Sequence, residues 1–458
     1  MDDSDAGSVP AGAQAGRQSH AASEAGHGRG GRESLAGSPV SGQAGASEQP
    51  RKSRRRRKRK RGRKVFAQDA AQRGGVSGEK PPRPAASPAR VTSPAGDARP
   101  APQGRNAEAA RRPAAGRKYR PGPLPVYAAL DLGTNNCRLL IAVPGKPGEF
   151  RVIDAFSRIV RLGEGLGASG RLADAAMTRA VEALRICADK LAAREISRAR
   201  LIATEACRAA ANGAEFLARV AEQTGLELEI IDRETEARLA VSGCGPLVEA
   251  KTQAVVLFDI GGGSSEIALV DVSGARRPRL ANHIVAWTSL PVGVVSLAER
   301  FGGRNVTREI FSAMVEEVSG MIDAFAERGR LGALVGSPGF HLLGTSGTVT
   351  TLAGVHLGLE RYDRRRVDGL WMQGGEIDSM VEKLLGWEFH QRVANPCIGN
   401  DRADLVLAGC AILQAIRRVW PSERLRVADR GLREGILSEL MGEDGAWRRS
   451  GHRAGARP

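Results

Sequence analysis

Two short segments of the sequence combine an acidic residue with small residues in a way that suits phosphate chemistry. In the segment VVLFDIGGGSSEIALV, residues 255–270, an apolar run ends at Asp259. The residues that follow it are Gly261, Gly262, Gly263 and Ser264. Glycines let the backbone approach a ligand closely, so their N–H groups can surround an anion. A carboxylate beside a phosphate would repel it unless a cation lies between them, and Asp259 therefore suggests Mg²⁺. A tight hairpin with an exposed aspartate explains this segment alone equally well.

The same pattern occurs earlier in the chain. The apolar segment VYAALDL, residues 126–132, carries Asp131 near its end, and the turn that follows contains Gly133, Thr134 and Asn135. Two such turns about one domain apart indicate a weak internal duplication. Two anion-binding turns that face each other would clamp a phosphate between them. The repeat favours this interpretation over two unrelated hairpins, which are the alternative.

The segments around these turns predict the elements that position them. Residues 138–143 and 150–156 have the composition of strands, residues 173–194 have apolar side chains at helical spacing, and residues 200–203 form a buried strand before a second helix. Strands that alternate with helices predict an α/β fold with a mostly parallel or mixed sheet. Asp174 is the expected N-cap of the helix at 173–194.

A third glycine turn follows the strand predicted at residues 340–344. It contains Gly344 and Ser346 and leads into a predicted helix that runs to about residue 357. We expect this turn to close the cleft around phosphate groups. A plain strand-to-helix turn without a ligand is the alternative.

The positive charge of the chain is concentrated in its first 120 residues. These hold 26 of the 68 Lys and Arg residues and 10 of the 51 Asp and Glu residues, so residues 121–458 are almost neutral. Residues 1–120 have few large apolar side chains, and we expect them to be disordered, as we do for residues 446–458. The basic run 51–64 would bind RNA or another polyanion in a salt-dependent way. A solvated arm without a dedicated partner is the alternative.

Several protein classes are not expected from this sequence. It has no apolar run of about 18 residues, so we expect no transmembrane segment. The first residues, MDDSDAGSVP, lack the basic and apolar regions of a secretory signal. The six cysteines show no C-x-x-C spacing, which predicts reduced thiols in a cytoplasmic protein.

Five motifs together carry a family resemblance. DLGTNNCRLL, TEACRAAANGAEF, IIDRETEARL, FDIGGGSSEIALV and LLGTSGTVTTLAG occur in this order. In order and spacing the chain resembles the exopolyphosphatase and guanosine pentaphosphate phosphohydrolase (Ppx/GppA) family, over about residues 125–442. That family belongs to the actin, Hsp70 and sugar-kinase superfamily. The resemblance implies an α/β fold of two duplicated actin-like (ribonuclease H-like) domains, at residues 124–250 and 251–445, with a cleft between them.

The resemblance also implies roles for individual residues. The family's glutamate directly before the Ala-Arg-Leu triplet activates the attacking water, and that position is Glu236 here. A pKa close to that of a solvated glutamate would keep it ionised at neutral pH, and a plain ion pair with an arginine is the alternative role. Asp131 and Asp259 match the acids that hold Mg²⁺ or another divalent cation. The implied phosphate-binding residues are Gly133, Thr134, Asn135, Arg208, Gly261, Gly262, Gly263, Ser264, Gly344 and Ser346.

The family pattern does not fix the roles of two residues, Thr235 and Arg208. Many relatives carry a glutamate directly before the catalytic one, and this chain has Thr235 there. The change removes a negative charge near the site, so metal binding need not follow the family pattern. Arg208 suits either a bidentate phosphate clamp or a brace for its own loop.

The function implied by the resemblance is a phosphohydrolase that removes the terminal phosphate of inorganic polyphosphate, using Mg²⁺ and a water activated by Glu236. The same chemistry on guanosine pentaphosphate is the alternative. A phosphotransferase of the sugar-kinase type and a non-catalytic polyphosphate or alarmone sensor are more distant alternatives. The sequence leaves a homodimer open.

Overall fold

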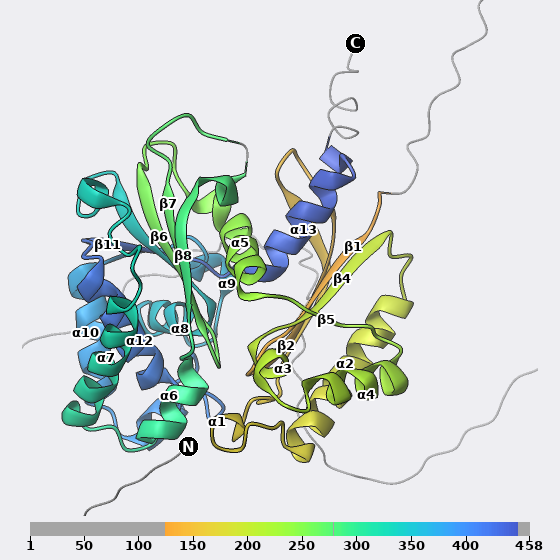
Figure 1. Ribbon diagram of the computed structural model, residues 1–458, viewed down its shortest axis with the longest axis horizontal. Coiled ribbons are helices and arrows are strands. Elements are labelled where there is room, and N and C mark those ends of the chain that lie inside the picture. The colour runs from red at the N-terminus through yellow and green to blue at the C-terminus, as the bar shows by residue number, and fades with distance from the viewer. Residues whose placement is uncertain (1–123, 278, 448–458) are drawn as a thin grey trace, which may run out of the picture. The chain divides into compact units, whose positions relative to one another are not determined.

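The structure is a computed structural model that describes residues 124–277 and 279–447 (Figure 1). The expectations of disorder for residues 1–120 and of polyanion binding for residues 51–64 concern residues outside this range. The same holds for the expected tail at 446–458, apart from residues 446 and 447.

The first of two β-sheets has five strands in the order β3-β2-β1-β4-β5. Their bounds are Tyr127–Leu132 for β1, Asn136–Pro144 for β2, Phe150–Ile159 for β3, Arg198–Ala203 for β4 and Glu229–Ile230 for β5. The β1 strand pairs antiparallel with β2 and parallel with β4. The turn Gly133–Asn135 therefore joins two central strands, at the end of β1.

The second sheet repeats this arrangement. Its six strands have the order β10-β11-β9-β6-β7-β8. Their bounds are Ala254–Ile260 for β6, Ser265–Asp271 for β7, Ile284–Leu290 for β8, Phe340–Thr345 for β9, Trp371–Gln373 for β10 and Arg424–Val427 for β11. Here β6 pairs antiparallel with β7 and parallel with β9. Since β6, β7, β8 and β9 occupy the places of β1, β2, β3 and β4, the predicted duplication is confirmed.

Helices cover the sheets and connect their strands. The first group is α1 (Leu166–Ser169), α2 (Asp174–Ala192), α3 (Glu205–Ala209), α4 (Gly213–Thr224) and α5 (Arg233–Cys244). The second is α6 (Val294–Phe301), α7 (Arg308–Asp323), α8 (Ser346–His356), α9 (Arg364–Val367), α10 (Gly374–Leu385), α11 (Phe389–Ala394), α12 (Val406–Val419) and α13 (Leu432–Glu443).

The helix predicted at residues 173–194 is α2. Its apolar residues Met177, Val181 and Leu184 are buried because they recur on one face, at three- and four-residue spacing. The expected N-cap was wrong. Ala173 holds the cap position without a side-chain bond, and Asp174 is the first helical residue, where its charge complements the helix dipole.

Two helices pack across the division between the sheets, and this joins the sheets into one body. Helix α13 buries Ile436 and Leu440 against Tyr127 and other residues of the first sheet, although it follows the last strand of the second. Helix α5 precedes β6 and buries Val241 against the second sheet. Figure 1 shows both helices between the sheets. The described strands before residue 250 thus belong to the first sheet and those after it to the second. The two cores exchange helices, since α5 precedes this residue and packs on the second sheet, whereas α13 follows it and packs on the first.

The crossing of α5 and α13 depends on glycines. A Cβ at Gly243 would lie 1.9 Å from the carbonyl oxygen of Gly431, and one at Gly435 would lie 2.0 Å from that of Leu239. Backbone atoms cannot move aside as a flexible side chain can, so only glycine permits this approach.

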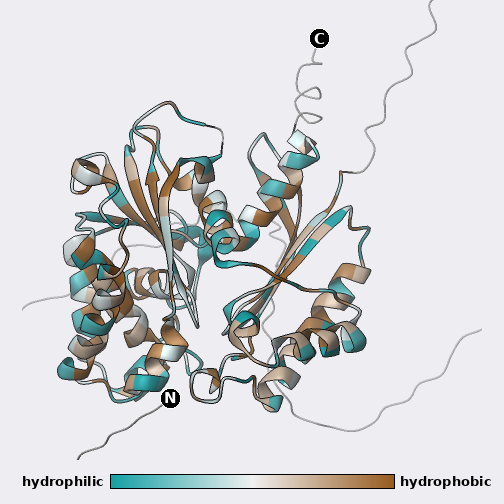
Figure 2. Cartoon of the chain, in the orientation of Figure 1, coloured by the Kyte–Doolittle hydropathy of each residue, from teal (hydrophilic) through white to brown (hydrophobic). Residues whose placement is uncertain are grey.

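Apolar residues occupy the strands and the helix faces that cover them (Figure 2). The six cysteines are buried free thiols, as expected from their spacing. Within the described residues, none of the helices combines the length and apolar composition that a membrane crossing requires.

Candidate functional site

The two predicted glycine turns meet between the sheets. Each is closed by its own backbone, Gly133 N–H donating to Asn136 O at 2.9 Å and Gly261 N–H donating to Ser264 O at 3.0 Å. A Cβ at Gly262 would lie 2.9 Å from Thr134 Cβ. The turns are therefore in contact, and the side of Gly262 that faces Thr134 has no room for a side chain.

A cavity of about 60 Å³ lies beside this contact. Four of the predicted phosphate-binding residues line it, namely Asn135, Gly261, Gly262 and Ser346. Asn135 and Asn136 both line it, and their Oδ1 atoms are buried without a hydrogen-bond partner. Because buried polar atoms are nearly always hydrogen-bonded, these two amides suit contact with a bound ligand.

Ser346 supports the same conclusion through its backbone. It is the first residue of α8, and its φ of 76° lies in the left-handed region that a serine rarely adopts. Such strain persists only where the surrounding structure imposes it, and it is frequent at ligand sites.

The other predicted phosphate-binding residues do not line the cavity. Gly344 lies inside β9, where a Cβ would be 2.6 Å from the Phe258 ring, so its small size serves packing. The Ser264 hydroxyl donates to Glu266 Oε1 at 2.7 Å. Gly133, Thr134 and Gly263 belong to the touching turns but are not part of the cavity wall.

The two acids Asp131 and Asp259 end equivalent strands on the two sides of the cleft. Burial raises the pKa of Asp131, which nearby Arg138 and Arg433 oppose. The pKa of Asp259 is raised to about 6, chiefly by burial; Arg138 opposes this rise and the charge of Asp131 adds to it. The carboxylates are thus electrostatic neighbours. Two neighbouring carboxylates are oxygen ligands of the kind that suits a hard cation such as Mg²⁺. Among the described residues, no three His, Cys, Asp or Glu side chains form a complete metal-binding group.

Glu236 lies in the first turn of α5, where Arg208 binds it. Arg208 Nη2 donates to Glu236 Oε2 at 3.0 Å. The glutamate was expected to titrate as a solvated one, and this was wrong. Burial raises its pKa well above the usual range, the charge of Glu266 adds to this, and Arg208 opposes it. A base held in this way is favoured for taking up a proton.

Arg208 braces its surroundings with all of its guanidinium nitrogens. Nε and Nη2 donate to Glu205 Oε2 at 3.0 and 2.7 Å, and Nη1 donates to Ile231 O at 2.6 Å. Glu205 also accepts from Arg233 at 2.9 Å. With every nitrogen engaged, this geometry favours the brace over the phosphate clamp, and the ion pair orients Glu236.

Thr235, the departure from the family pattern, takes part in the cap of α5. Asp232 Oδ1 accepts from the Thr235 N–H at 2.7 Å, and Asp232 Oδ2 accepts from its hydroxyl at 3.0 Å. The threonine hydroxyl is therefore bound to the capping aspartate and does not replace a carboxylate in the cleft.

The sequence interpretation missed Glu266, which lies on β7 and is buried. Ser264 and Ser289 hydroxyls donate to its Oε1 at 2.7 and 2.9 Å. Burial raises its pKa to about 7, and the charge of Asp259 contributes. A charged residue within the apolar strand SEIALVD was the available signal.

Arg402 was also missed, and it lines the cavity. Burial lowers its pKa. Its segment is tied to the first lobe, because Arg161 forms a bidentate ion pair with Asp404 at 3.0 Å for both bonds. Arg161 has a φ of 47°, so the backbone turn that presents its side chain is itself strained. The sequence offered only a charged triplet before an apolar helix.

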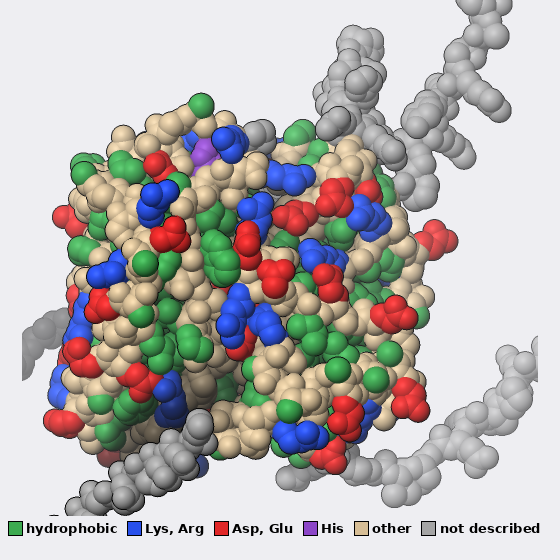
Figure 3. Space-filling view, viewed as in Figure 1, with side chains coloured by type: hydrophobic (Ala, Val, Ile, Leu, Met, Phe, Trp, Pro, Cys, Tyr) green, Lys and Arg blue, Asp and Glu red, His purple; other side chains and the backbone are tan. Residues whose placement is uncertain are grey.

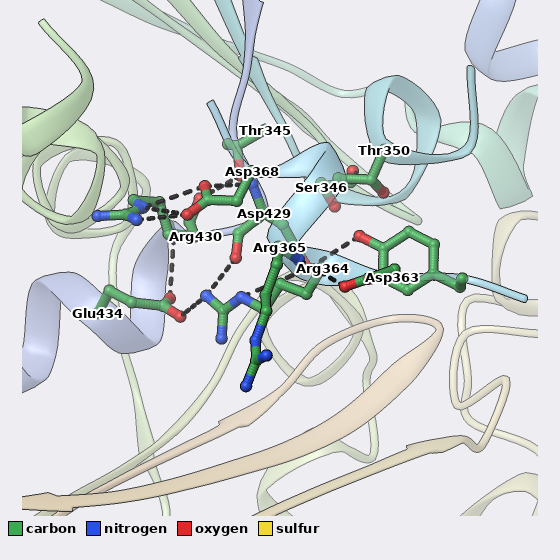
Figure 4. A network of polar contacts seen from close by, with 12 residues as sticks. Thr345, Ser346, Thr350, Asp363, Arg364, Arg365, Asp368, Asp429, Arg430 and Glu434 are labelled. Carbon is green, nitrogen blue, oxygen red and sulfur yellow. Dashed lines mark hydrogen bonds and ion pairs between the residues drawn. The ribbon is translucent and has the colours of Figure 1, made fainter. Parts of the chain in front are cut away.

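The loop after β11 reaches the cleft and is held by a polar network (Figure 4). Thr345 Oγ1 donates to Arg430 O at 2.6 Å, Arg364 Nη2 donates to Glu434 at 2.8 Å, and Arg430 pairs with Asp368. A Cβ at Gly431, between these residues, would lie 3.9 Å from Asp259 Oδ2. The network thus fixes the backbone beside Asp259. Over the visible face of the protein, acidic and basic side chains are interspersed (Figure 3).

Comparisons with known proteins show which family the sequence belongs to. A model of the Ppx/GppA phosphatase family matches residues 142–444. Exopolyphosphatase 2 of Mycobacterium tuberculosis is 31% identical over 331 residues, which are 69% of this chain and 98% of that protein. A guanosine-5'-triphosphate,3'-diphosphate pyrophosphatase of Photobacterium profundum is 28% identical over 319 residues, 69% of this chain and 59% of that protein.

Solved structures show the same fold. The crystal structure of the Aquifex aeolicus member of the Ppx/GppA family has 28% identity and a TM-score of 0.56, covering 70% of this chain and 99% of that one. An exopolyphosphatase from Cytophaga hutchinsonii has 21% identity and a TM-score of 0.61, covering 69% and 98%. The expected fold class, α/β with two duplicated actin-like domains, is confirmed.

Proposed function

The chain belongs to the Ppx/GppA phosphatase family and is a hydrolase of phosphoanhydrides, and from this premise we propose that it removes the terminal phosphate of inorganic polyphosphate. The observation that carries the proposal is Glu236, a glutamate whose side chain is 14% exposed and which Arg208 holds between the lobes at 3.0 Å. It lies among the charges of Asp259 and Glu266, so it faces the same cleft as the two glycine turns.

In the proposed reaction Glu236 acts as the base and Arg208 holds it in position. A water oxygen attacks the terminal phosphorus while Glu236 takes a proton from that water. The P–O bond of the anhydride breaks, and the electron pair leaves on the shortened chain. Because Arg208 occupies Glu236 Oε2, the other oxygen, Oε1, is left for the water. Such reactions need positioning and charge stabilisation more than covalent chemistry from the protein.

The phosphate groups are received by the cavity and its turns. Backbone N–H groups of the Gly261 turn suit the phosphate oxygens, and Arg402 supplies a positive charge in the same wall. Asp131 and Asp259 would hold Mg²⁺, which neutralises phosphate charge and favours ionised carboxylates. Without that cation, burial holds the pKa of Asp259 at about 6, so part of the population is protonated near neutral pH.

Guanosine pentaphosphate is the second candidate substrate. The Photobacterium profundum relative, named for a guanosine nucleotide, matches the same share of this chain as the exopolyphosphatase does. The hydrolytic step would be the same, since only the group beyond the reacting phosphates differs. A cytoplasmic location, a homodimer and polyanion binding by residues 51–64 remain predictions from the sequence.

The test is phosphate release by the full chain from polyphosphate and from guanosine pentaphosphate, with and without Mg²⁺. We expect Glu236→Gln to lower the rate about 10²- to 10⁴-fold, because glutamine keeps a bond to Arg208 but cannot accept the proton. Glu234→Gln is the matched control, two residues earlier in the same helical turn, and should retain the rate.

Three outcomes would overturn the proposal. Unchanged release by Glu236→Gln would remove this residue from the reaction. A wild type that binds polyphosphate but releases no phosphate would favour a sensor. Consumption of ATP that depends on an added polyol would favour a phosphotransferase.

A further inference from the structure

A second, larger cavity lies apart from the proposed catalytic cleft. Its volume is about 370 Å³, within the range of about 300–1,000 Å³ that small-molecule pockets occupy. Its lining residues come mainly from α5 and the turn after it, from the segment between β7 and β8, and from α13 and the residues that follow it. Its described lining residues include none of those that line the cavity between the glycine turns.

Both lobes contribute to this cavity, through the two helices that they exchange. Ser242 of α5 belongs to the helix that packs on the second sheet, while Ser438 and Gly442 of α13 belong to the helix that packs on the first. Ser242 Oγ donates to Glu439 Oε1 at 3.4 Å across the helix crossing. A ligand here would contact both lobes at the point where they are connected.

One wall of the cavity is positively charged. Arg276, Arg277, Arg279 and His283 line it. The Arg277 N–H donates to His283 Nε2 at 2.8 Å, which fixes the backbone at this point. Arg276 Nη2 donates to Glu249 O at 2.5 Å and to Thr252 O at 2.9 Å, and Arg277 Nη1 donates to Asn282 O at 3.4 Å, so backbone carbonyls orient these two guanidinium groups. No described carboxylate forms an ion pair with any of the three guanidinium groups. Arginines without acidic partners are suited to bind a phosphate group.

The cavity also has an apolar lining. Val248, Val272, Leu280 and the Trp447 ring supply apolar surface. Glu439 adds a hydrogen-bond acceptor. Trp447 is fixed in place, since its Nε1 donates to Glu149 O at 2.8 Å. An inorganic phosphate chain would gain nothing from an apolar wall and would be repelled by a carboxylate, whereas a nucleoside offers a ring for the first and hydroxyl donors for the second.

We propose that this cavity binds a nucleoside phosphate as an effector, with its phosphates on Arg276, Arg277 and Arg279 and its nucleoside toward Trp447 and Glu439. A ligand that contacts both lobes favours one arrangement of them, and it changes catalysis by the difference in its affinity for the two arrangements. The binding rests on this cavity alone. Its effect on the rate rests on the proposed phosphohydrolase activity.

The probe is GDP with a fluorescent group on its ribose, titrated into the full chain with and without excess tripolyphosphate to fill the catalytic cleft. We expect saturable binding that tripolyphosphate does not displace. Arg279→Gln should weaken it about tenfold, the loss of one charge-assisted hydrogen bond. Arg330→Gln, which removes an exposed arginine elsewhere, should leave it unchanged.

A cavity-filling variant separates binding from folding. A Cβ at Gly442 would meet only Arg279 Nη2 at 3.3 Å and Trp447 Cζ3 at 3.8 Å, so Gly442→Leu fills the cavity without striking the backbone. This variant should lose GDP binding, keep its thermal stability and keep phosphate release. In the wild type GDP should change the KM of phosphate release, and in Gly442→Leu it should not.

The outcomes are distinct. Displacement of GDP by tripolyphosphate, or full binding by Gly442→Leu, would place the nucleotide in the catalytic cleft and overturn the proposal. Pyrophosphate that binds as tightly as GDP would show an anion site without nucleoside recognition, which overturns the assigned ligand. Binding to the cavity in a wild type that releases no phosphate would support this site and contradict the proposed function instead.

Discussion

The two hairpins that face each other in the cleft share their geometry and differ in charge at one equivalent position. In the first hairpin Asp131 pairs in register with Arg138, and in the second Asp259 pairs with Glu266. Arg138 lowers the pKa of both aspartates, whereas the charge of Asp259 raises the pKa of Glu266, and the charges of Asp259 and Glu266 both raise the pKa of Glu236. Duplication thus produced a cationic side and a proton-holding side within one cleft.

The turns of the two hairpins also differ in the chemical groups that they carry. The first presents amide side chains, Asn135 and Asn136, whose Oδ1 atoms are buried without partners. The second presents glycines, and Thr134 of the first turn packs against them. The two turns therefore carry different groups, amide side chains in one and glycines in the other, and the proposed site uses both copies.

The largest expected effect concerns the proton-holding side. The pKa of Glu266 is about 7 in the folded protein, above its unfolded value of 4.5, so its favourable contribution is complete below 4.5 and is lost as pH rises through 7. We expect the free energy of unfolding, measured with urea and EDTA, to fall by roughly 2 kcal/mol from pH 5 to pH 8 on account of this group.

A variant of Glu266 is the control for that measurement. Glu266→Gln cannot titrate, so its unfolding free energy should depend less on pH than that of the wild type. Mg²⁺ at pH 8 should raise the stability of the wild type, because a cation favours ionised carboxylates. Equal pH dependence in both proteins would contradict the protonated state of Glu266.

The next effect concerns the cationic side. Arg138→Gln removes the charge that opposes protonation of Asp131 and Asp259, so the acidic limb of the kcat/KM profile should move to higher pH. The KM for polyphosphate should rise about tenfold through loss of one charge near the phosphates. Arg158→Gln, one strand further from the cleft, should change neither quantity. A profile identical to that of the wild type would show that the hairpin charges do not govern the site.

The smallest expected effect is a difference in unfolding free energy between two glycine-to-alanine variants, one in each turn. Gly262→Ala places a Cβ 2.9 Å from Thr134 Cβ, whereas Gly133→Ala meets nothing closer than 3.6 Å. We expect the first to lower the free energy of unfolding by about 1 kcal/mol and the second to lower it much less. Urea denaturation of both variants checks the difference, and equal losses would mean that the turns are not packed as described.

Sequence reasoning predicted residues that the structure brings together, since four of the predicted phosphate-binding residues line the cavity, and its failures have physical causes. Asp131 and Asp259 were identified because an acid at the end of an apolar strand before a glycine turn is a local pattern. The role of Glu236 came from the family resemblance, but its raised pKa did not, because burial depends on neighbours far along the chain. Gly344 was assigned to phosphate binding because the sequence alone does not distinguish a glycine that close packing requires from one that contacts a ligand.

Other features have no local pattern at all. Glu266 and Arg402 lie in segments that are otherwise typical of a strand and of a helix start. The exchange of α5 and α13 between the two cores, and the second cavity that it creates, depend on tertiary packing alone.

The sequence by itself determined the duplicated strand-and-turn units, the two acids and the family, because periodicity, turn residues and motif order are properties of neighbouring residues. Only the tertiary structure decided which charges meet, since Arg138 lowers the pKa of Asp131 and Asp259 while Glu266 raises that of Glu236, which lies far from it in the sequence. Low solvent access strengthens those interactions, and solvent access belongs to the folded chain as a whole.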